Sequence, residues 1–269
     1  MSPDKPAPVP ARLERGITIQ DLVFRYPDQP GQVLNGVSVF LPAGTVVALV
    51  GENGAGKTTL VKLLCRFYEP SQGHILIDGV ELTRLALESW RERVSAAYQD
   101  FGRFEFLARE TVGVGQIAQV EDTTAVQAAV TRAGAEDVPP RLPLGLETQL
   151  GRSWENGVEL SGGQWQKLAL ARAMMRPRPL LVLFDEPTAA LDAQTEHLLF
   201  ERLASSARDG ASAGTVTILV THRFSTVRMA DLIVVLNRGQ IAEVGSHRDL
   251  LARGGLYAEL YELQARAYL

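Results

Sequence analysis

The sequence has a single cysteine, Cys65, among its 269 residues, so neither an internal disulfide nor a cysteine-rich metal site can form. This suits a reducing compartment, and Cys65 is expected to be a small buried apolar residue. A large excess of charge of either sign is also lacking, because the net charge is −4 and no run of five or six like charges occurs. Nucleic acid is therefore not expected as a partner.

Long apolar runs are absent too. A membrane-spanning helix needs about 20 mostly apolar residues, and the only long uncharged stretch, residues 29–51, is broken by prolines and glycines. We expect neither a membrane span nor a signal peptide, and no internal repeat is visible. The first ten residues, "MSPDKPAPVP", hold four prolines. They predict a Pro-rich linker or tail over residues 1–15, with the fold beginning near Gly16.

The first half of the chain predicts mostly strands. Residues 16–26 and 33–41 are expected to form an antiparallel ribbon around the turn "PDQPG". A strand over 45–50 runs directly into a glycine loop and a helix expected from Lys57 to Tyr68. Residues 73–82 predict a short strand pair, and "VSAAYQD" a strand that ends at Gln99.

The second half begins with helical and loop signals over residues 101–179. Two nearly continuous apolar runs follow, "LLVLFDE" and "TVTILVTH", of the kind found in buried parallel strands. Residues 231–245 predict a hairpin, and the chain closes with a helical segment. The order predicts an α/β fold of strand, phosphate loop and helix, then a helical insertion, then the rest of the sheet.

The segment "GENGAGKTT", residues 51–59, matches the phosphate-loop pattern G-x-x-x-x-G-K-[ST], and it follows a predicted strand and opens a predicted helix. Its glycines let backbone N–H groups face phosphate oxygens, and the helix N-terminus adds the positive end of its dipole. Lys57 is expected to reach the β and γ phosphates, and Thr58 to bind Mg²⁺. An ordinary glycine turn does not explain all these features together.

Two adjacent acids, Asp185 and Glu186, end the strand in "LLVLFDEP", at the edge where open α/β sheets bind ligands. Asp185 suits the Mg²⁺ shell, and Glu186 suits a base that orients the water attacking the γ phosphate. Acids at a strand end are often only solvated. A second acid directly after a metal-binding one, however, favours hydrolysis over mere binding.

Three further residues are candidates for the same site. His222 ends the strand after Asp185 and would lie near the γ phosphate if the two strands are neighbours. Gln99 is a candidate for a Mg²⁺ or water contact, with an ordinary surface glutamine as the alternative. Tyr26 is a candidate for stacking on adenine, although a tyrosine in a β ribbon is more often packing. A structural role is expected for the other histidines, His74, His197 and His247.

The segment "ELSGGQWQKLALARA" contains a second possible anion site. Ser161 and Gln164 have the spacing of a capping box, which explains the start of a helix. It does not explain Gly162 and Gly163, which weaken a helix start unless something approaches the backbone closely. Because residues 51–58 already surround one face of the phosphates, this second site indicates a nucleotide on another chain, and hence a dimer.

Together these motifs resemble those of the ATP-binding cassette (ABC) ATPases, from about Arg15 to the C-terminus. "GENGAGKTT" is similar to Walker A, "LLVLFDEP" to Walker B with its catalytic glutamate, "LSGGQ" to the signature and "AALD", residues 189–192, to the D-loop. His222, Gln99 and Tyr26 resemble the switch histidine, Q-loop glutamine and A-loop aromatic. "RFYEPSQGHILIDG" and the segment from Thr221 onward resemble exporter-type cassettes.

The resemblance implies a P-loop NTPase fold, with a RecA-like core, an antiparallel β subdomain and an inserted α-helical subdomain. The nucleotide-binding domain would span residues 16–269. Its expected parts are the core with the β subdomain over about 16–99 and 173–245, the helical subdomain over about 100–172, and C-terminal helices over about 246–269.

The resemblance also implies ATP and Mg²⁺ as cofactors. The catalytic residues would be Glu186, His222, Gln99 and Lys57, and the Mg²⁺ ligands Thr58, Gln99 and Asp185. The expected contacts to ATP are Tyr26, Gly51, Glu52, Asn53, Gly54, Ala55, Gly56, Lys57, Thr58, Thr59, Ser161, Gly162, Gly163, Gln164 and Asp192.

The implied partners are a second cassette, identical or different, and the transmembrane domain of an exporter in the same or another chain. They place the cassette at the cytoplasmic face of the cell membrane, and "PARLERG" resembles the linker that joins such domains. The alternative is a soluble ABC ATPase that acts on nucleic acid or ribosomes, which usually has a coiled coil or tandem cassettes. A P-loop kinase or GTPase leaves "LSGGQ" without a role. Two segments, 100–115 and 151–159, depart from the exporter pattern.

Overall fold

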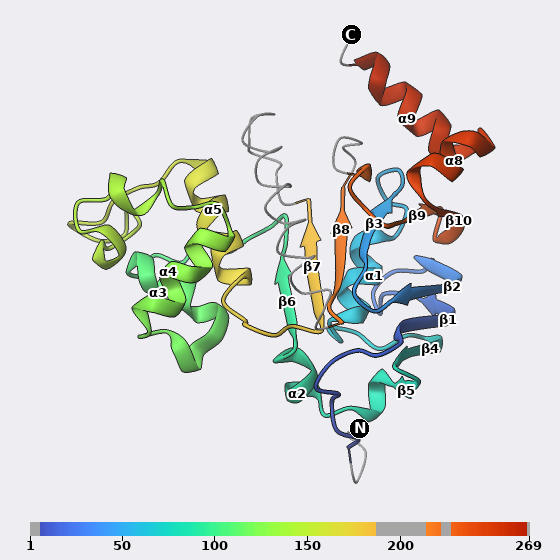
Figure 1. Ribbon diagram of the computed structural model, residues 1–269, viewed down its shortest axis with the longest axis horizontal. Helices are drawn as coiled ribbons and strands as arrows, with labels where there is room; N and C mark the ends of the chain where they lie inside the picture. The colour runs from blue at the N-terminus through green and yellow to red at the C-terminus, as the bar shows by residue number, and fades with distance from the viewer. Residues whose placement is uncertain (1–5, 187–213, 222–226, 268–269) are drawn as a thin grey trace. The chain divides into compact units, whose positions relative to one another are not determined.

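The computed structural model describes residues 6–186, 214–221 and 227–267, and the chain forms two compact units (Figure 1). The first unit comprises residues 1–94, 178–185 and 207–269, and the second comprises residues 95–177 and 186–206. Among the described helices, none has both the length and the apolar character that a membrane crossing needs.

The first unit contains an antiparallel sheet with the strand order β2-β1-β4-β5. Its strands are β1 (Gly16–Phe24), β2 (Leu34–Pro42), β4 (Gln72–Ile77) and β5 (Val80–Glu81). Strand β1 pairs with β2 on one side and with β4 on the other, antiparallel in both cases. The predicted ribbon and the predicted short strand pair are thus confirmed.

The second sheet of this unit has the order β10-β9-β3-β8-β7. Its strands are β3 (Val46–Val50), β7 (Leu181–Asp185), β8 (Val216–Val220), β9 (Leu232–Asn237) and β10 (Gln240–Gly245). Strand β8 is parallel to both β3 and β7, and β3 is parallel to β9. Every residue of β3 and β8 is buried, which explains their unbroken apolar runs. Strand β6 (Val94–Ala97) lies where the chain passes into the second unit.

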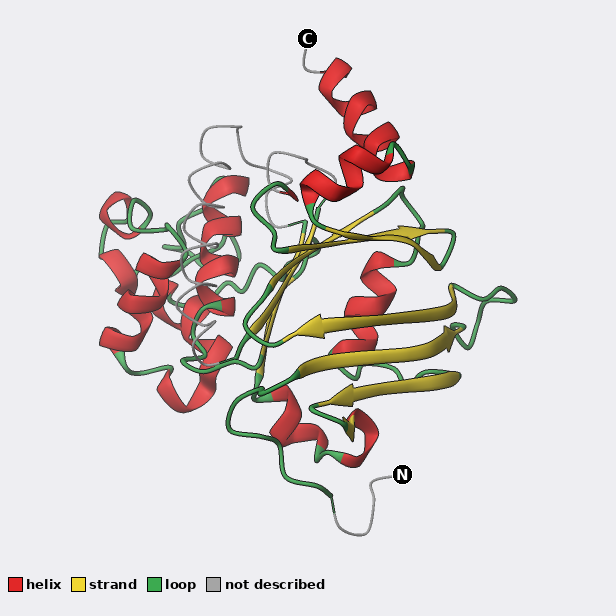
Figure 2. Ribbon diagram, turned by 45° about the vertical axis from the view of Figure 1, so that its right-hand side comes forward, coloured by secondary structure: helices red, strands yellow, loops and turns green. Residues whose placement is uncertain are grey.

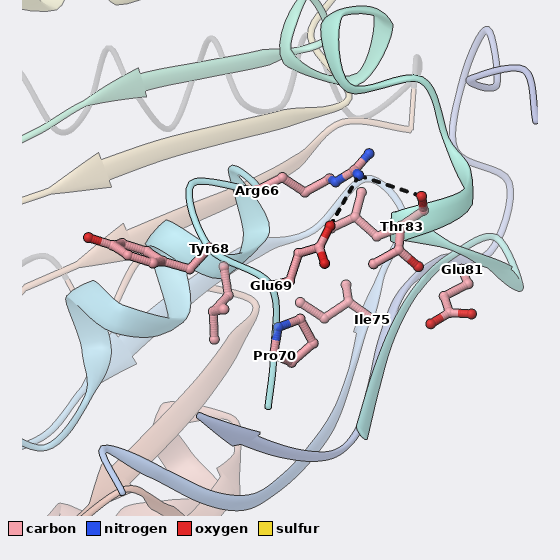
Figure 3. Close-up of a pocket in the computed structure, with 9 residues that line it drawn as sticks. Arg66, Tyr68, Glu69, Pro70, Ile75, Glu81 and Thr83 are labelled. Carbon is pink, nitrogen blue, oxygen red and sulfur yellow. Dashed lines mark hydrogen bonds and ion pairs between the residues drawn. The ribbon is translucent and has the colours of Figure 1, made fainter. Parts of the chain in front are cut away.

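Helix α1 (Lys57–Leu64) lies between the two sheets (Figures 1 and 2). It ends before the predicted Tyr68 because Arg66 has a left-handed backbone, with φ of 53°, and the N–H of Phe67 donates back to the carbonyl of Lys62. Arg66 donates to the carbonyl of Thr83, in the turn η1 (Leu82–Arg84), at 3.5 Å (Figure 3). Its guanidinium donates to the carbonyl of Leu85 at 2.7 Å and lies 3.8 Å from Glu69 in the small pocket of Figure 3.

The C-terminal part forms two helices, α8 (His247–Arg253) and α9 (Leu256–Ala267), separated at Gly254, whose φ is 64°. Tyr257 is fully buried against the sheet core with Val235 and Leu250. His247 Nδ1 lies 2.6 Å from the Tyr257 hydroxyl, so His247 has the structural role expected of it.

The N-terminal segment packs on the first unit from before Gly16. Ala7 forms a bridge with Leu85, and Leu13 is only 2% exposed. The guanidinium of Arg93, which lies just after α2 (Leu87–Arg91), donates to the carbonyls of Pro10 and Ala11 at 3.2 and 2.6 Å. The described part of the predicted linker is therefore bound to the domain. The groups that accept these hydrogen bonds are backbone carbonyls, so no residue type in the sequence indicates them.

The second unit is helical, as predicted. Its longer elements are α3 (Ala108–Gly113), α4 (Thr123–Arg132) and α5 (Gly162–Ala173), and its short turns are η2 (Val114–Gln119), η3 (Pro139–Arg141) and η4 (Gly145–Glu147). Helices α3 and α4 pack against α5. Asp122 caps α4 by accepting from the N–H groups of Thr124 and Ala125.

Candidate functional site: the phosphate loop and the signature helix

The glycine loop joins the end of β3 to the start of α1, as the sequence predicts. Gly51 has a φ of 147°, and a Cβ there would lie 2.1 Å from the carbonyl oxygen of Leu236 on β9. Gly56 has a φ of 105° and is the N-cap of α1, which starts without a side-chain cap. The first N–H groups of a helix have no partner within the helix. The loop therefore presents a helix start suited to an anion.

Lys57 is the first residue of α1, and its side chain turns back under the loop. It is only 7% exposed, and its Nζ atom donates to the carbonyl oxygens of Gly51 at 2.7 Å and Glu52 at 3.0 Å. A buried ammonium group needs such partners. The same contacts hold the positive charge beside the helix start, where phosphate would bind.

The parallel strands bring Asp185 to the edge of the sheet from which the loop departs. Val220 of β8 is aligned with both Leu49 of β3 and Asp185 of β7, so the carboxyl ends of the three strands meet. Asp185 is 4% exposed, and Thr221, directly after β8, is 3% exposed. Sequence reasoning did not consider Thr221, which β8 brings to the same edge of the sheet.

The oxygen donors near the loop fit Mg²⁺. The Asp185 carboxylate is at the strand edge, and Thr58 is exposed at the start of α1. Mg²⁺ prefers oxygen ligands and is usually held by one or two protein groups together with the phosphates of the nucleotide. Within the described ranges no group of three or more His, Cys, Asp or Glu residues could hold a metal ion by itself.

Tyr26 lies beside the start of α1. Its hydroxyl shares a hydrogen bond with that of Thr59 at 3.1 Å. Its ring packs edge-on against Phe24 and Tyr68, with centroids 4.9 and 5.2 Å apart. The structure thus brings Tyr26 next to the phosphate loop. It also shows the ring packing against other aromatic residues, which was the alternative to stacking on adenine.

The second unit contains the other candidate surface, at the start of α5. Ser161 and Gln164 form the predicted capping box: the N–H of Ser161 donates to Gln164 Oε1 at 2.9 Å, and the N–H of Gln164 donates to Ser161 Oγ at 3.3 Å. Ser161 and Gly162 are exposed. A Cβ built on Gly162 would meet nothing within 4 Å, so contacts among the described residues do not require glycine there.

The structure also describes two of the predicted catalytic residues, Gln99 and Glu186. Gln99 is exposed and follows β6 in the second unit. Glu186 directly follows β7, is half-buried and has a left-handed backbone with φ of 49°, a conformation that non-glycine residues adopt mainly at constrained sites. His222, Asp192 and His197 lie outside the described residues.

The sheet has parallel strands, a glycine loop with a buried lysine after β3, and an acid at the end of β7, which β8 separates from β3. This arrangement defines a P-loop nucleotide-binding protein of the α/β class. A model of the family described as "ABC transporter" matches residues 34–189, which is more than half of the chain. The chain belongs to the ABC transporter family.

Relatives and solved structures agree with this assignment. The chain is 42% identical over 258 residues to an ATP-dependent lipid A-core flippase of Cupriavidus metallidurans, covering 95% of this chain and 42% of that protein. It is 40% identical over 256 residues to ABC transporter B family member 19 of Arabidopsis thaliana, covering 94% of this chain and 19% of that protein. The structure of a bacterial Atm1-family ABC exporter with ATP bound matches with a TM-score of 0.86 and 39% identity, covering 98% of this chain and 44% of that one. The chain thus resembles exporter-type nucleotide-binding domains and spans less than half the length of these relatives.

Proposed function

We propose that this chain is the ATP-binding and ATP-hydrolysing cassette of an exporter. Two cassettes pair head to tail around two ATP molecules at the cytoplasmic face of the membrane, and their closure and reopening drive an associated transmembrane domain. The observation that carries the proposal is the coexistence of two phosphate-type surfaces in one chain. The first is the loop around Lys57, and the second is the capped, open helix start at Ser161 and Gly162.

Residues of the phosphate loop and of the strand ends around it bind and polarise the nucleotide. Lys57 and the N–H groups of the loop neutralise phosphate charge, and the ring of Tyr26 stacks on the adenine. Thr58, Asp185 and Gln99 would hold Mg²⁺, which would offset the charge on the β and γ phosphates. Glu186 orients and deprotonates the attacking water.

Two further residues, His222 and Asp192, complete each site together with the signature helix. Gln99 and His222 contact the γ phosphate or the water, and Asp192 lies in the segment that faces the opposite cassette. The helix start at Ser161 to Gln164 contacts the ATP held by the partner's phosphate loop, where its N–H groups and dipole favour negative charge. Each ATP is then bound by two chains, so ATP binding favours the dimer.

The first experiment tests the sandwich. Losing a general base typically costs about 10²- to 10⁴-fold in rate, so Glu186→Gln should nearly abolish hydrolysis while ATP binding persists. With MgATP this variant should elute as a dimer in size-exclusion chromatography and as a monomer without nucleotide. Glu88→Gln, at an exposed position of α2, is the matched control and should hydrolyse ATP normally. A Glu186→Gln chain that stays monomeric at saturating ATP contradicts the sandwich.

A complementation experiment tests whether the signature acts on the partner's ATP. A Lys57→Met chain lacks a working phosphate loop, and a Ser161→Tyr chain lacks a working signature, so each alone should be inactive. A mixed dimer has one complete site, formed by the loop of the Ser161→Tyr chain and the signature of the Lys57→Met chain. Recovery of hydrolysis on mixing is the expected result, and a mixture as inactive as its components contradicts the head-to-tail arrangement.

A further inference from the structure

The segment that follows Gln99 is attached to the far end of the signature helix. Arg172, in the last turn of α5, donates through Nη1 and Nη2 to the carbonyl oxygen of Gly102 at 3.2 and 3.1 Å. The same guanidinium lies 4.4 Å from the ring centre of Phe104, within the range of a cation–π contact. Through Arg172, α5 is therefore joined to the chain only a few residues after Gln99.

Glu105 attaches the same segment to the loop that precedes the signature. Its carboxylate accepts from the N–H of Ser153 at 3.1 Å. Its carbonyl oxygen accepts from Trp154 Nε1 at 2.8 Å and from Gln149 Nε2 at 2.9 Å. One residue thus receives three hydrogen bonds from three positions of the loop between Gln149 and Val158.

Two glycines allow this close packing. Gly151 has a φ of 94°, and a Cβ there would lie 2.1 Å from Glu105 Cγ. A Cβ on Gly157 would lie 1.8 Å from the carbonyl oxygen of Gly151. The loop can therefore close on Glu105 only with glycine at both positions.

The ends of this loop are tied together directly before the signature. Leu150 and Val158 form a bridge, with the N–H of Gly151 donating to the carbonyl of Val158 at 3.0 Å. Glu159 then accepts from Trp165 Nε1 of α5 at 3.2 Å. A loop held at Glu105 thus fixes the backbone that leads into Ser161.

Both segments that depart from the exporter pattern, 100–115 and 151–159, meet in this arrangement. We propose that Glu105 and Arg172 are positioning residues that join the segment after Gln99 to both sides of the signature. Through these contacts the position of Gln99 relative to Ser161 stays fixed. The proposal rests on the proposed function, in which Gln99 contacts the chain's own ATP and Ser161 the partner's. The two ATP sites of a dimer are then coupled through this clasp, defined as Glu105, Arg172 and the loop Gln149–Val158.

The test uses the chain in the Glu186→Gln background, where the dimer accumulates. Glu105→Ala removes the acceptor of the Ser153 N–H and should weaken the MgATP-dependent dimer dissociation constant about tenfold, the effect of one hydrogen bond to a charged group. MgATP binding by the monomer, measured by calorimetry, should be unchanged. Glu105→Gln keeps an acceptor oxygen and should restore most of the dimer affinity. Glu155→Ala, an exposed glutamate of the same loop, is the matched control and should leave the constant unchanged.

A spectroscopic measurement reports the clasp without a dimer. Trp90 and Trp165 are 0% and 2% exposed, whereas Trp154 is 54% exposed, so iodide quenching of tryptophan fluorescence reports mainly Trp154. Releasing the loop should increase quenching in Glu105→Ala and in Arg172→Lys, which keeps the charge but loses the two-pronged contact. Glu155→Ala should quench like the parent.

The outcomes separate the two proposals. If the parent dimerises and Glu105→Ala dimerises equally well, the positioning role is wrong while the proposed function stands. Unchanged quenching in both Glu105→Ala and Arg172→Lys also overturns the clasp. If the parent stays monomeric with MgATP, the proposed function fails and the positioning role fails with it.

Discussion

The Nζ atom of Lys57 lies 2.7 Å from the carbonyl oxygen of Gly51, six residues earlier in the chain. This hydrogen bond joins the last part of the phosphate loop to its first residue. It holds the ammonium group on the inner side of the curved backbone. The charge is buried at the helix start, so it is effective toward a phosphate and costly to lose.

Lys57→Met should therefore reduce ATP hydrolysis on the order of 10²-fold or more, because a positioned donor to the developing charge is removed. The fold should persist, since methionine fills a similar volume without an unpaired charge. Phosphate release and circular dichroism measure the two effects. Lys167→Met, which breaks an ion pair with Asp137 of 2.7 Å in the second unit, is the control and should hydrolyse ATP at close to the normal rate. Normal turnover in Lys57→Met contradicts the assignment.

Gly51→Ala should destabilise the protein more than Gly79→Ala. Both glycines have positive φ, 147° and 90°, but only at Gly51 would a Cβ meet another atom, the carbonyl of Leu236 at 2.1 Å. For a residue with a Cβ, the positive φ alone costs about 1–2 kcal/mol of stability. This is the loss expected for Gly79→Ala. Thermal unfolding monitored by circular dichroism compares the two, and equal losses of stability would show that the contact with β9 relaxes freely.

Tyr26→Phe and Tyr26→Ala separate the two contacts of Tyr26. Tyr26→Phe loses only the hydrogen bond to Thr59 and should bind ATP with nearly normal affinity. Tyr26→Ala also loses the ring, and stacking of a base on an aromatic ring is worth about 1–3 kcal/mol. ATP affinity should then fall about tenfold. A fluorescent ATP analogue measures both variants, and equal affinity for all three proteins contradicts stacking.

Asp78 should make stability depend on pH. Burial raises the pKa of its carboxyl, but the N–H groups of Gly16, Glu14 and Arg15, each donating at 2.8 Å, lower the pKa below its usual 3.8. Because the folded pKa is lower than the unfolded one, the stabilisation is complete above the unfolded value and is lost as the pH falls through the folded value.

Asp78→Asn should therefore reduce the free energy of unfolding by about 1 kcal/mol at neutral pH. The difference from the unmodified chain should shrink as the pH falls below about 4. Urea unfolding at several pH values measures it. Asp28→Asn, at an exposed position, is the matched control and should leave the free energy of unfolding at neutral pH unchanged. A pH-independent difference for Asp78→Asn would mean that its charge is not responsible.

Local chemistry was readable from the sequence. Gly51, Gly56 and Lys57 follow a buried strand and open a helix, and that context predicted the phosphate loop. The spacing of Ser161 and Gln164 predicted a capping box that the structure forms with hydrogen bonds of 2.9 and 3.3 Å. These features depend on neighbours a few residues apart, so they can be recognised before the fold is known.

Tertiary structure decided everything that joins distant segments. It aligned Asp185 and Leu49 through Val220 and attached the segment before Gly16 to Arg93 and Asp78. It also joined Glu105 to Trp154, 49 residues away in the chain. Most of these contacts use backbone carbonyl groups, which every residue type possesses, or backbone N–H groups, which only proline lacks. The sequence by itself determined which groups could bind ATP, and only the packed chain determined which of them meet.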